Sequence, residues 1–190
     1  MAVKILTARQ AADLVPNEVN FATNGFMGAS FAEEIAIEIE NRFLETGSPK
    51  NLTLLFCAAQ GDSKDKGLNH FAHEGLICRA IGAHWGLAPK LGKMVCENKI
   101  LAYDFPQGIT NHMFRDSAAH KPGTISHVGI GTFVDSRLLG GKLNALTSKA
   151  EDLVKLMEID GKEYLFYKTH PVDFAILGGT YADENGNISI

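Results

Sequence analysis

Hydrophobic residues recur every four positions in one segment near the amino end of the chain, at Phe31, Ile35, Ile39 and Phe43. This spacing places them on one face of an amphipathic helix, with the intervening glutamates off that face. Ser30 and Glu33 match a capping box, which predicts that the helix begins directly after Ser30. Gly47 and Pro49 predict where it ends.

Shorter apolar runs predict strands, and they alternate with further helical patterns. The expected strands are 19–23, 52–59, 79–84, 99–102 and 172–177. The expected additional helices are 7–15, 71–77, 90–98 and 109–120. The run 52–59 is apolar throughout, which is typical of a strand buried on both faces of a parallel sheet. The alternation predicts an α/β fold with a mainly parallel sheet flanked by helices, a three-layer sandwich.

A different pattern follows towards the carboxyl end. The β-type runs 154–159 and 162–167 flank the dipeptide Asp160-Gly161. Asp-Gly between two such runs is a strong signal for a tight β-hairpin. We therefore expect an antiparallel hairpin over residues 154–167.

Composition narrows the class of protein and its partners. The 190 residues suggest one domain, and a net charge of −4 makes nucleic acid and anionic membranes poor partners. No run is long and apolar enough to span a bilayer, and the amino end lacks a signal-peptide layout. Cys57, Cys78 and Cys96 are odd in number and lack CxxC spacing, so we expect buried thiols in the cytoplasm.

Gln107 is the most interesting polar residue, because it follows a predicted strand directly. Pro106 removes a backbone donor and should end the strand, and Gly108 allows a sharp turn. Parallel α/β sheets bind ligands at the carboxyl ends of their strands, so the Gln107 amide is a candidate ligand contact. The alternative is a turn glutamine in solvent.

Other chemistry is less well supported by the residues themselves. His70 and His73, with Glu74 adjacent, could share a helix face, but the HExxH spacing of zinc enzymes is absent and we expect no metal site. There is no GxSxG motif. Glu97 is a candidate carboxylate nucleophile, and a solvated surface charge is the favoured alternative. The segment 24–28 between strand and helix could bind an anion or could be a plain tight turn.

Many separated motifs together closely resemble the amino-terminal half of class I CoA-transferases, of the acetate/propionate (short-chain acyl) type in which both halves form one polypeptide. The matching residues, in chain order, are 23–26, 60–62, 67–76, 84–93, 97–100, 106–108, 129–135 and 180–188. The resemblance covers essentially the whole chain. It implies one amino-terminal CoA-transferase domain over 1–190, incomplete at its carboxyl end.

The resemblance also implies a reaction and a site. Such enzymes exchange CoA between an acyl-CoA and a short-chain carboxylate through a glutamyl-CoA thioester. The glutamate would lie outside this chain, on a carboxyl-terminal half or a second subunit, so the chain alone should be inactive. Coenzyme A would be a substrate and not a permanent cofactor.

Within this chain the resemblance gives Gln107 a supporting catalytic role. It assigns substrate contacts to Asn24, Gly25, Phe26, Gly129, Gly131 and Thr132. A homo- or hetero-oligomer is expected. The alternative is a non-catalytic α/β domain that binds a small carboxylate or a partner domain.

Overall fold

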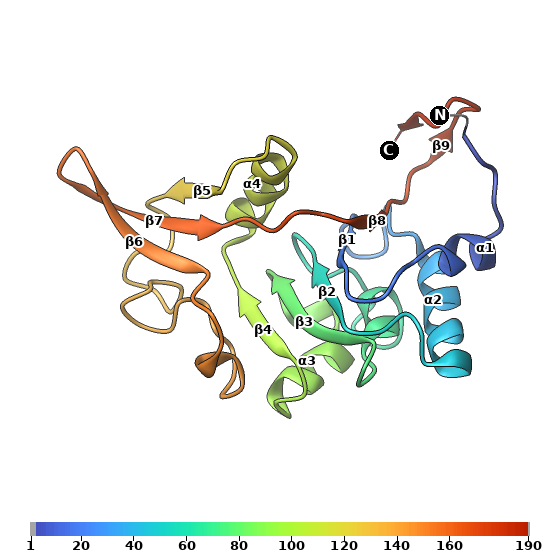
Figure 1. Cartoon of the computed structure of the whole chain (residues 1–190), viewed down its shortest axis with the longest axis horizontal. Helices are drawn as coiled ribbons and strands as arrows, with labels where there is room; N and C mark the ends of the chain where they lie inside the picture. The colour runs from blue at the N-terminus through green and yellow to red at the C-terminus, as the bar shows by residue number, and fades with distance from the viewer. Residues whose placement is uncertain (1–2, 190) are drawn as a thin grey trace.

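The computed structural model describes residues 3–189, and its centre is a five-stranded sheet in which every pair of neighbouring strands is parallel (Figure 1). The strands are β1 (Asn20–Thr23), β2 (Leu52–Leu55), β3 (Ile77–Gly82), β4 (Leu101–Asp104) and β8 (Phe174–Ile176). Their order across the sheet is β4-β3-β2-β1-β8. The expected parallel α/β fold is confirmed.

The register of the sheet separates two hydrophobic cores. Phe21 pairs with Leu54, Leu54 with Ala80, and Ala80 with Ala102, and all four lie in the first core. The residues that follow them along their strands lie in the second core: Ala22, Leu55, Ile81 and Tyr103. Successive strand residues point to opposite faces, so one continuous sheet supplies both cores.

Helices cover both faces. The first core is completed by α1 (Ala8–Asp13), α2 (Glu33–Thr46), α3 (Pro89–Cys96) and the 3₁₀ turn η1 (Gly67–Phe71). The second is completed by α4 (Gln107–Ala118) and part of a smaller sheet. Two further 3₁₀ turns are η2 (Trp85–Leu87) and η3 (Thr147–Lys149). Among the described residues, none of the helices has the length and apolar character needed to span a membrane.

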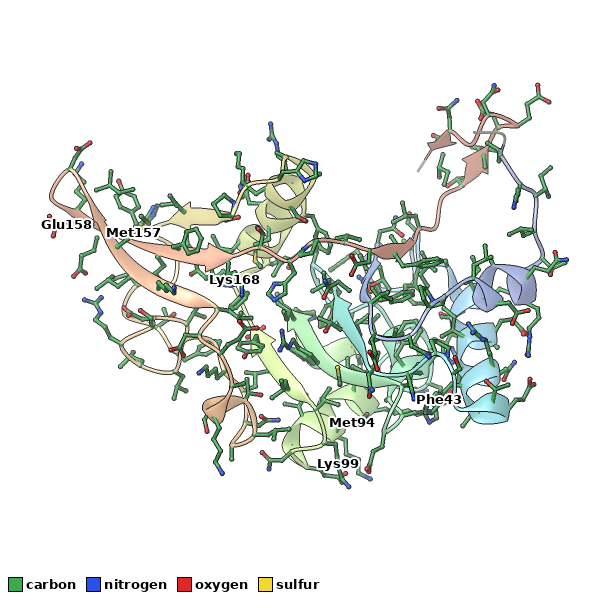
Figure 2. The ribbon with its side chains drawn as sticks, viewed as in Figure 1. Phe43, Met94, Lys99, Met157, Glu158 and Lys168 are labelled. Carbon is green, nitrogen blue, oxygen red and sulfur yellow. The ribbon has the colours of Figure 1, made fainter. Side chains whose placement is uncertain are left out.

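The smaller sheet is antiparallel, with β5 (Gly123–Ser126), β7 (Lys162–Lys168) and β6 (Val154–Ile159) in that order. Asp160 and Gly161 both have positive φ, 50° and 72°, as a type I′ turn requires. The predicted hairpin is therefore confirmed, and Figure 2 labels Glu158 near its tip. A short antiparallel pair, β9 (Tyr181–Ala182) with β10 (Ile188–Ser189), lies close to the amino end in Figure 1.

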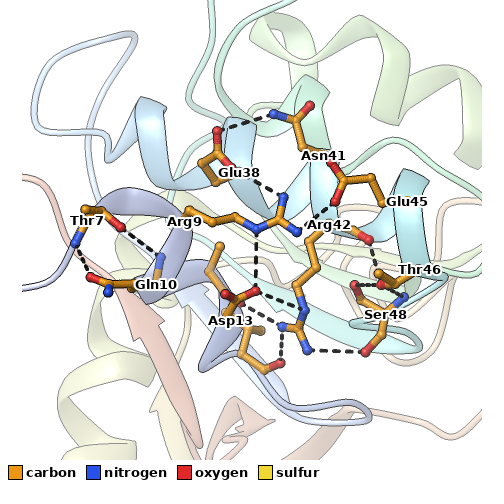
Figure 3. A network of polar contacts seen from close by, with 12 residues as sticks. Thr7, Arg9, Gln10, Asp13, Glu38, Asn41, Arg42, Glu45, Thr46 and Ser48 are labelled. Carbon is orange, nitrogen blue, oxygen red and sulfur yellow. Dashed lines mark hydrogen bonds and ion pairs between the residues drawn. The ribbon is translucent and has the colours of Figure 1, made fainter.

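Polar contacts hold α1 against α2 (Figure 3). Thr7 and Gln10 form a capping box at the start of α1. Arg42 of α2 reaches the other end, where its Nη1 donates to the carbonyl oxygens of Ala12 (2.7 Å) and Val15 (2.8 Å). The Ala12 carbonyl also accepts from the Val15 N–H (3.2 Å), and Val15 lies just beyond the helix, so Arg42 completes the hydrogen bonding of the helix end.

Two boundaries near the sheet differ from the sequence predictions. Ser30 does not cap α2: its φ is 58°, and the helix begins at Glu33 after Ala32, which makes no side-chain cap. The close approach of Gly178 explains this, because a Cβ there would lie 2.3 Å from the Ser30 carbonyl oxygen. The predicted strand 52–59 is a strand only as far as Leu55.

Two helix predictions also need correction. The segment 71–77 is not a helix, because η1 ends at Phe71 and β3 begins at Ile77. Between them, His73 is held by a contact with Glu40 of α2. The helix expected from Ile109 begins two residues earlier, at Gln107.

Candidate functional site

Two open clefts lie at the carboxyl ends of the parallel strands, and α4 contributes residues to both. The Gln107 cleft is lined by the ends of β3 and β4, the start of α4 and the loop 128–134. The Asn24 cleft is lined by the loop after β1, by Cys57 and Gln60 after β2, by two α4 residues and by segments around β8. Their volumes, about 400 and 590 Å³, suit small molecules.

Gln107 is the first residue of α4, and its side chain is exposed at the Gln107 cleft. Pro106 is the N-cap residue and makes no side-chain cap hydrogen bond, so it leaves the first amide groups of the helix free of side-chain partners. The positive end of the helix dipole therefore opens towards this cleft and favours an anion. A neutral amide at that point can donate to an anionic oxygen without adding charge.

The opposite wall is the loop 128–135, which is fixed by hydrogen bonds on the side away from the cleft. The carboxylate of Asp135, which is buried, accepts from the Gly131 N–H (2.9 Å) and from the backbone and guanidinium of Arg137. The Arg137 side chain, with these backbone bonds, holds the pKa of Asp135 well below its usual range. Tyr167 donates to the Val128 carbonyl oxygen (2.6 Å). Asp135 and Tyr167 thus fix the wall that carries Gly129 and Thr132.

Asp104 and His84 bring ionisable side chains into the same cleft from neighbouring strands. Asp104 ends β4, opposite Gly82 of β3, and His84 follows two residues after that glycine. The Trp85 Nε1–H donates to Asp104 Oδ1 at 3.2 Å. Burial raises the pKa of Asp104, and the Trp85 hydrogen bond and nearby His84 offset only part of that effect.

In the Asn24 cleft, the backbone after β1 is tightly constrained. Gly25 has φ 119°, and a Cβ there would lie 2.6 Å from the Ala29 carbonyl oxygen, so only glycine fits without distortion. The Asn24 side chain accepts from the Gly178 N–H (2.8 Å) and donates to the Gly178 carbonyl oxygen (3.2 Å). The Asn24 amide therefore holds the loop after β1 against the segment that follows β8. Phe26, in contrast, is 56% exposed.

A fully buried glutamine, Gln60, joins the loops after β1 and β2. Its side chain accepts from Thr23 Oγ1 (2.9 Å) and donates to the carbonyl oxygens of Gly25 (3.2 Å) and Ala58 (2.7 Å). Cys57 faces the cleft, and its Sγ–H donates to Asn111 Oδ1 (2.9 Å). Burial raises the pKa of the Cys57 thiol, which disfavours the nucleophilic thiolate.

The remaining sequence candidates lie elsewhere. His70 bridges Glu33 and Glu40 of α2, and His73 contacts Glu40 as well. Within residues 3–189 no group of three or more His, Cys, Asp or Glu side chains is placed to hold a metal ion. Glu97 is exposed at the end of α3, near the start of β4, and so at the edge of the sheet opposite the clefts.

The structure thus divides the predicted site residues between two clefts. Gln107, Gly129 and Thr132 share one, and Asn24, Gly25 and Phe26 line the other. Gly131 instead supports the loop through Asp135. The sequence reasoning did not select Asp104 or His84, although both follow or end a predicted strand, which is the signal that singled out Gln107.

Known proteins resemble the chain over nearly its whole length. Caffeate CoA-transferase from Acetobacterium woodii is 44% identical over 186 residues, which are 98% of this chain and 35% of that protein. The apoenzyme structure of the acyl-CoA transferase YdiF from Escherichia coli O157:H7 matches with a TM-score of 0.95 and 39% identity, over 98% of this chain and 36% of that chain. The chain therefore spans about a third of the length of these relatives.

Two further matches bear on substrate and assembly. A structure of the same YdiF, described as a thioester complex with CoA, matches at 40% identity with a TM-score of 0.91, over 94% of this chain and 35% of that chain. Acetate CoA-transferase subunit alpha from E. coli K12 is 23% identical over 100% of this chain and 76% of that subunit.

A family model described as coenzyme A transferase matches residues 5–190. The chain therefore belongs to the coenzyme A transferase family.

Proposed function

We propose that this chain is the amino-terminal, Gln107-bearing part of a short-chain acyl-CoA:carboxylate CoA-transferase whose catalytic glutamate lies outside the chain. The observation that carries the proposal is the placement of Gln107. Its amide lies at the start of α4, in a cleft at the carboxyl ends of β3 and β4. A neutral donor beside a helix amino terminus suits an acyl oxygen on which negative charge develops.

The proposed reaction proceeds in two halves. The glutamate carboxylate attacks the thioester carbonyl of acyl-CoA, and the CoA thiolate leaves to give an acyl-glutamyl anhydride. The thiolate then attacks the glutamyl carbonyl, which releases the carboxylic acid as its anion and leaves a glutamyl-CoA thioester. A second carboxylate reverses these steps and leaves as its own CoA thioester.

Gln107 would donate a hydrogen bond in this reaction without raising the pKa of the attacking glutamate. A second carboxylate at that position would raise the pKa of the attacking glutamate, and a neutral amide does not. The amide can donate to the acyl oxygen as charge accumulates there, so the contact is stronger in the transition state than in the ground state.

The names of the relatives support a proposal for the substrates and for the partner segment. The proteins named above act, by their names, on acetate and caffeate, and one is a subunit. We therefore propose that the substrates are CoA thioesters and small carboxylates, and that a carboxyl-terminal half or second subunit supplies the glutamate within an oligomer. The three cysteines are free thiols, which fits a reducing cytoplasm, but the expectation that they are buried is wrong, since Cys78 and Cys96 are exposed and Cys57 is half-buried.

The test replaces Gln107 in the complete enzyme. Gln107→Ala removes one donor to a developing oxyanion, so it should lower kcat by roughly a hundred- to a thousandfold. The accompanying rise in KM should be smaller. Gln107→Glu should be worse, because two carboxylates would then share one site. Steady-state transfer kinetics with acetyl-CoA and propionate measure both, and thermal melts check folding.

Two results would contradict the proposal. Near-normal kcat in both variants would make Gln107 a helix-start residue with no role in transfer. Transfer of CoA by the purified 190-residue chain alone would show that the nucleophile is in this chain. If the complete protein bound small carboxylates without transferring CoA, the alternative of a non-catalytic binding domain would be favoured.

A further inference from the structure

Asp104 is a carboxylate that the reaction above does not use, although it lines the Gln107 cleft. Its Oδ1 accepts the Trp85 Nε1–H, and no described residue offers a hydrogen bond to its Oδ2. Asp104 is half-buried, and burial raises its pKa, so the charged form is poorly solvated. Asp104 is therefore a carboxyl group with unused acceptor capacity at the wall of a ligand-sized cleft.

The described side chains of the cleft offer a second anion no guanidinium or ammonium partner. The described residues that line it include no lysine and no arginine, and its polar side chains besides Asp104 are His84, Gln107 and Thr132. Arg137, which follows the loop 128–135, is already paired with Asp135 and Glu163. Recognition of a substrate carboxylate normally uses a guanidinium or ammonium group, because a charge-assisted hydrogen bond offsets the lost hydration.

The remaining lining is hydrocarbon. Phe105, Val128, Phe133 and Val134 contribute apolar surface on both sides of the cleft. Phe133 is 41% and Val128 43% exposed, so this surface is open to a ligand. Such walls favour an uncharged acyl chain by removing its apolar area from water.

We propose that Asp104 is a specificity-determining residue, which restricts the acids accepted in this cleft to those that are uncharged away from the reacting carboxylate. The inference rests on the proposed function. The reacting carboxylate of any substrate lies near Gln107. The second carboxylate of a short dicarboxylate must then occupy the same cleft, close to Asp104, where the described residues provide no lysine or arginine.

The experiment compares two acceptors that differ in one charge. With acetyl-CoA as donor, the complete enzyme is assayed for kcat/KM with succinate and with monomethyl succinate, and propionate serves as a reference acid. Wild type should prefer the monoester. Asp104→Asn keeps the side-chain shape and removes the charge, so it should narrow the preference by about tenfold, as Coulomb's law gives for like charges in a partly exposed site.

The matched control is Glu158→Gln, which removes the same charge from the exposed hairpin tip (Figure 2). It should leave the ratio of the two acids unchanged. An effect of Glu158→Gln as large as that of Asp104→Asn would mean that net charge alone sets the preference, and it would overturn the assignment to Asp104.

The two possible failures are distinguishable. If wild type transfers CoA to propionate but uses succinate and monomethyl succinate equally well, the specificity role is wrong and the proposed function stands. This comparison needs no variant, so it decides the question even if Asp104→Asn fails to fold. If wild type transfers CoA to none of the three acids, the proposed function itself is contradicted.

Discussion

Polar side chains are treated differently on the two sides of this molecule. On the scaffold side, formed by α1, α2 and η1, charged groups satisfy one another: Arg42 caps the carbonyls at the end of α1, and Glu40 receives both His70 and His73. At the clefts, Gln107 is exposed, and Asp104 makes one side-chain hydrogen bond to the described residues.

The difference separates stability from function. A polar group that is already paired stabilises the fold and offers little to a ligand, whereas a group left partly unsatisfied can bind one. Substitutions of buried, paired groups on the scaffold side should therefore lower Tm and leave the kinetics unchanged. Substitutions of Gln107 and Asp104 at the Gln107 cleft should instead change the kinetics and leave Tm unchanged.

The largest effect on stability is expected at Arg42. Its side chain is 17% exposed, and replacing it with methionine would leave the Val15 carbonyl without its donor and would remove one of the donors to the Ala12 carbonyl. The loss should be about 3 kcal/mol. For a domain of this size that corresponds to a fall in Tm of roughly 6–12 °C. Thermal melts of the complete protein measure it.

Arg9→Met is the matched control for Arg42→Met. Arg9 pairs with Glu45 (2.7 Å), Glu38 and Asp13, all on the surface, where ion pairs contribute little. Its Tm should stay close to wild type. Equal decreases in Tm in the two variants, or a lower kcat in either variant with Tm unchanged, would contradict the separation of stability from function.

Two glycines provide a further test: Gly25, which lines the Asn24 cleft, and Gly108, which follows Gln107 in the chain. Gly25→Ala should cost about 1–3 kcal/mol, because φ is 119° and the new Cβ would meet the Ala29 carbonyl oxygen. Gly108 lies in the first turn of α4, and nothing beyond the backbone of its own helix lies within 4 Å of where a Cβ would be, so Gly108→Ala should leave Tm unchanged. A lower kcat/KM for Gly108→Ala at unchanged Tm would show that substrate or the partner segment approaches the helix there.

A smaller, pH-dependent effect is expected at Glu40. Burial raises its pKa, but the hydrogen bonds from His73 and His70 together outweigh this and leave the pKa below the ordinary value of 4.5. A lowered carboxyl pKa stabilises the fold above the unfolded-state value, and this stabilisation is lost as the pH falls through the folded-state value.

Glu40→Gln should therefore lower Tm by about 2–4 °C near neutral pH, as expected for a loss of about 1 kcal/mol. The difference from wild type should shrink as the pH is lowered from neutral to acidic values, because Glu40 becomes protonated as the pH falls through its lowered folded-state pKa. A Tm difference that is constant between these pH values would mean that the His70 and His73 contacts do not depend on the charge of Glu40.

Much of the fold could be predicted because its signals are local. The four-residue spacing from Phe31 to Phe43 and the Asp160-Gly161 turn each specify one element without reference to distant residues. The capping prediction at Ser30 failed because Gly178, far along the chain, packs against its carbonyl. The 52–59 strand prediction failed at its end, where Ala58 accepts from the buried Gln60 amide.

The site was less predictable, because it depends on contacts between residues that are far apart in the chain. Gln107 stood out because Pro106 marks the end of a strand. The meeting of Asp104 with His84 depends on the pairing of Gly82 with Asp104 between β3 and β4, which no local pattern specifies. The role of Asn24 depends likewise on Gly178, 154 residues away in the chain.

The position of β8 has a consequence for synthesis. β1 lies between β2 and β8, and Asn20 is bonded to Asp173 across 153 residues of chain. A ribosome adding about 5–20 residues per second needs roughly 8–30 s to produce that stretch. During this interval one edge of β1 exposes unpaired backbone groups, which are a template for pairing with other chains. A nascent chain arrested before β8 emerges should therefore recruit chaperones more strongly than one arrested after it.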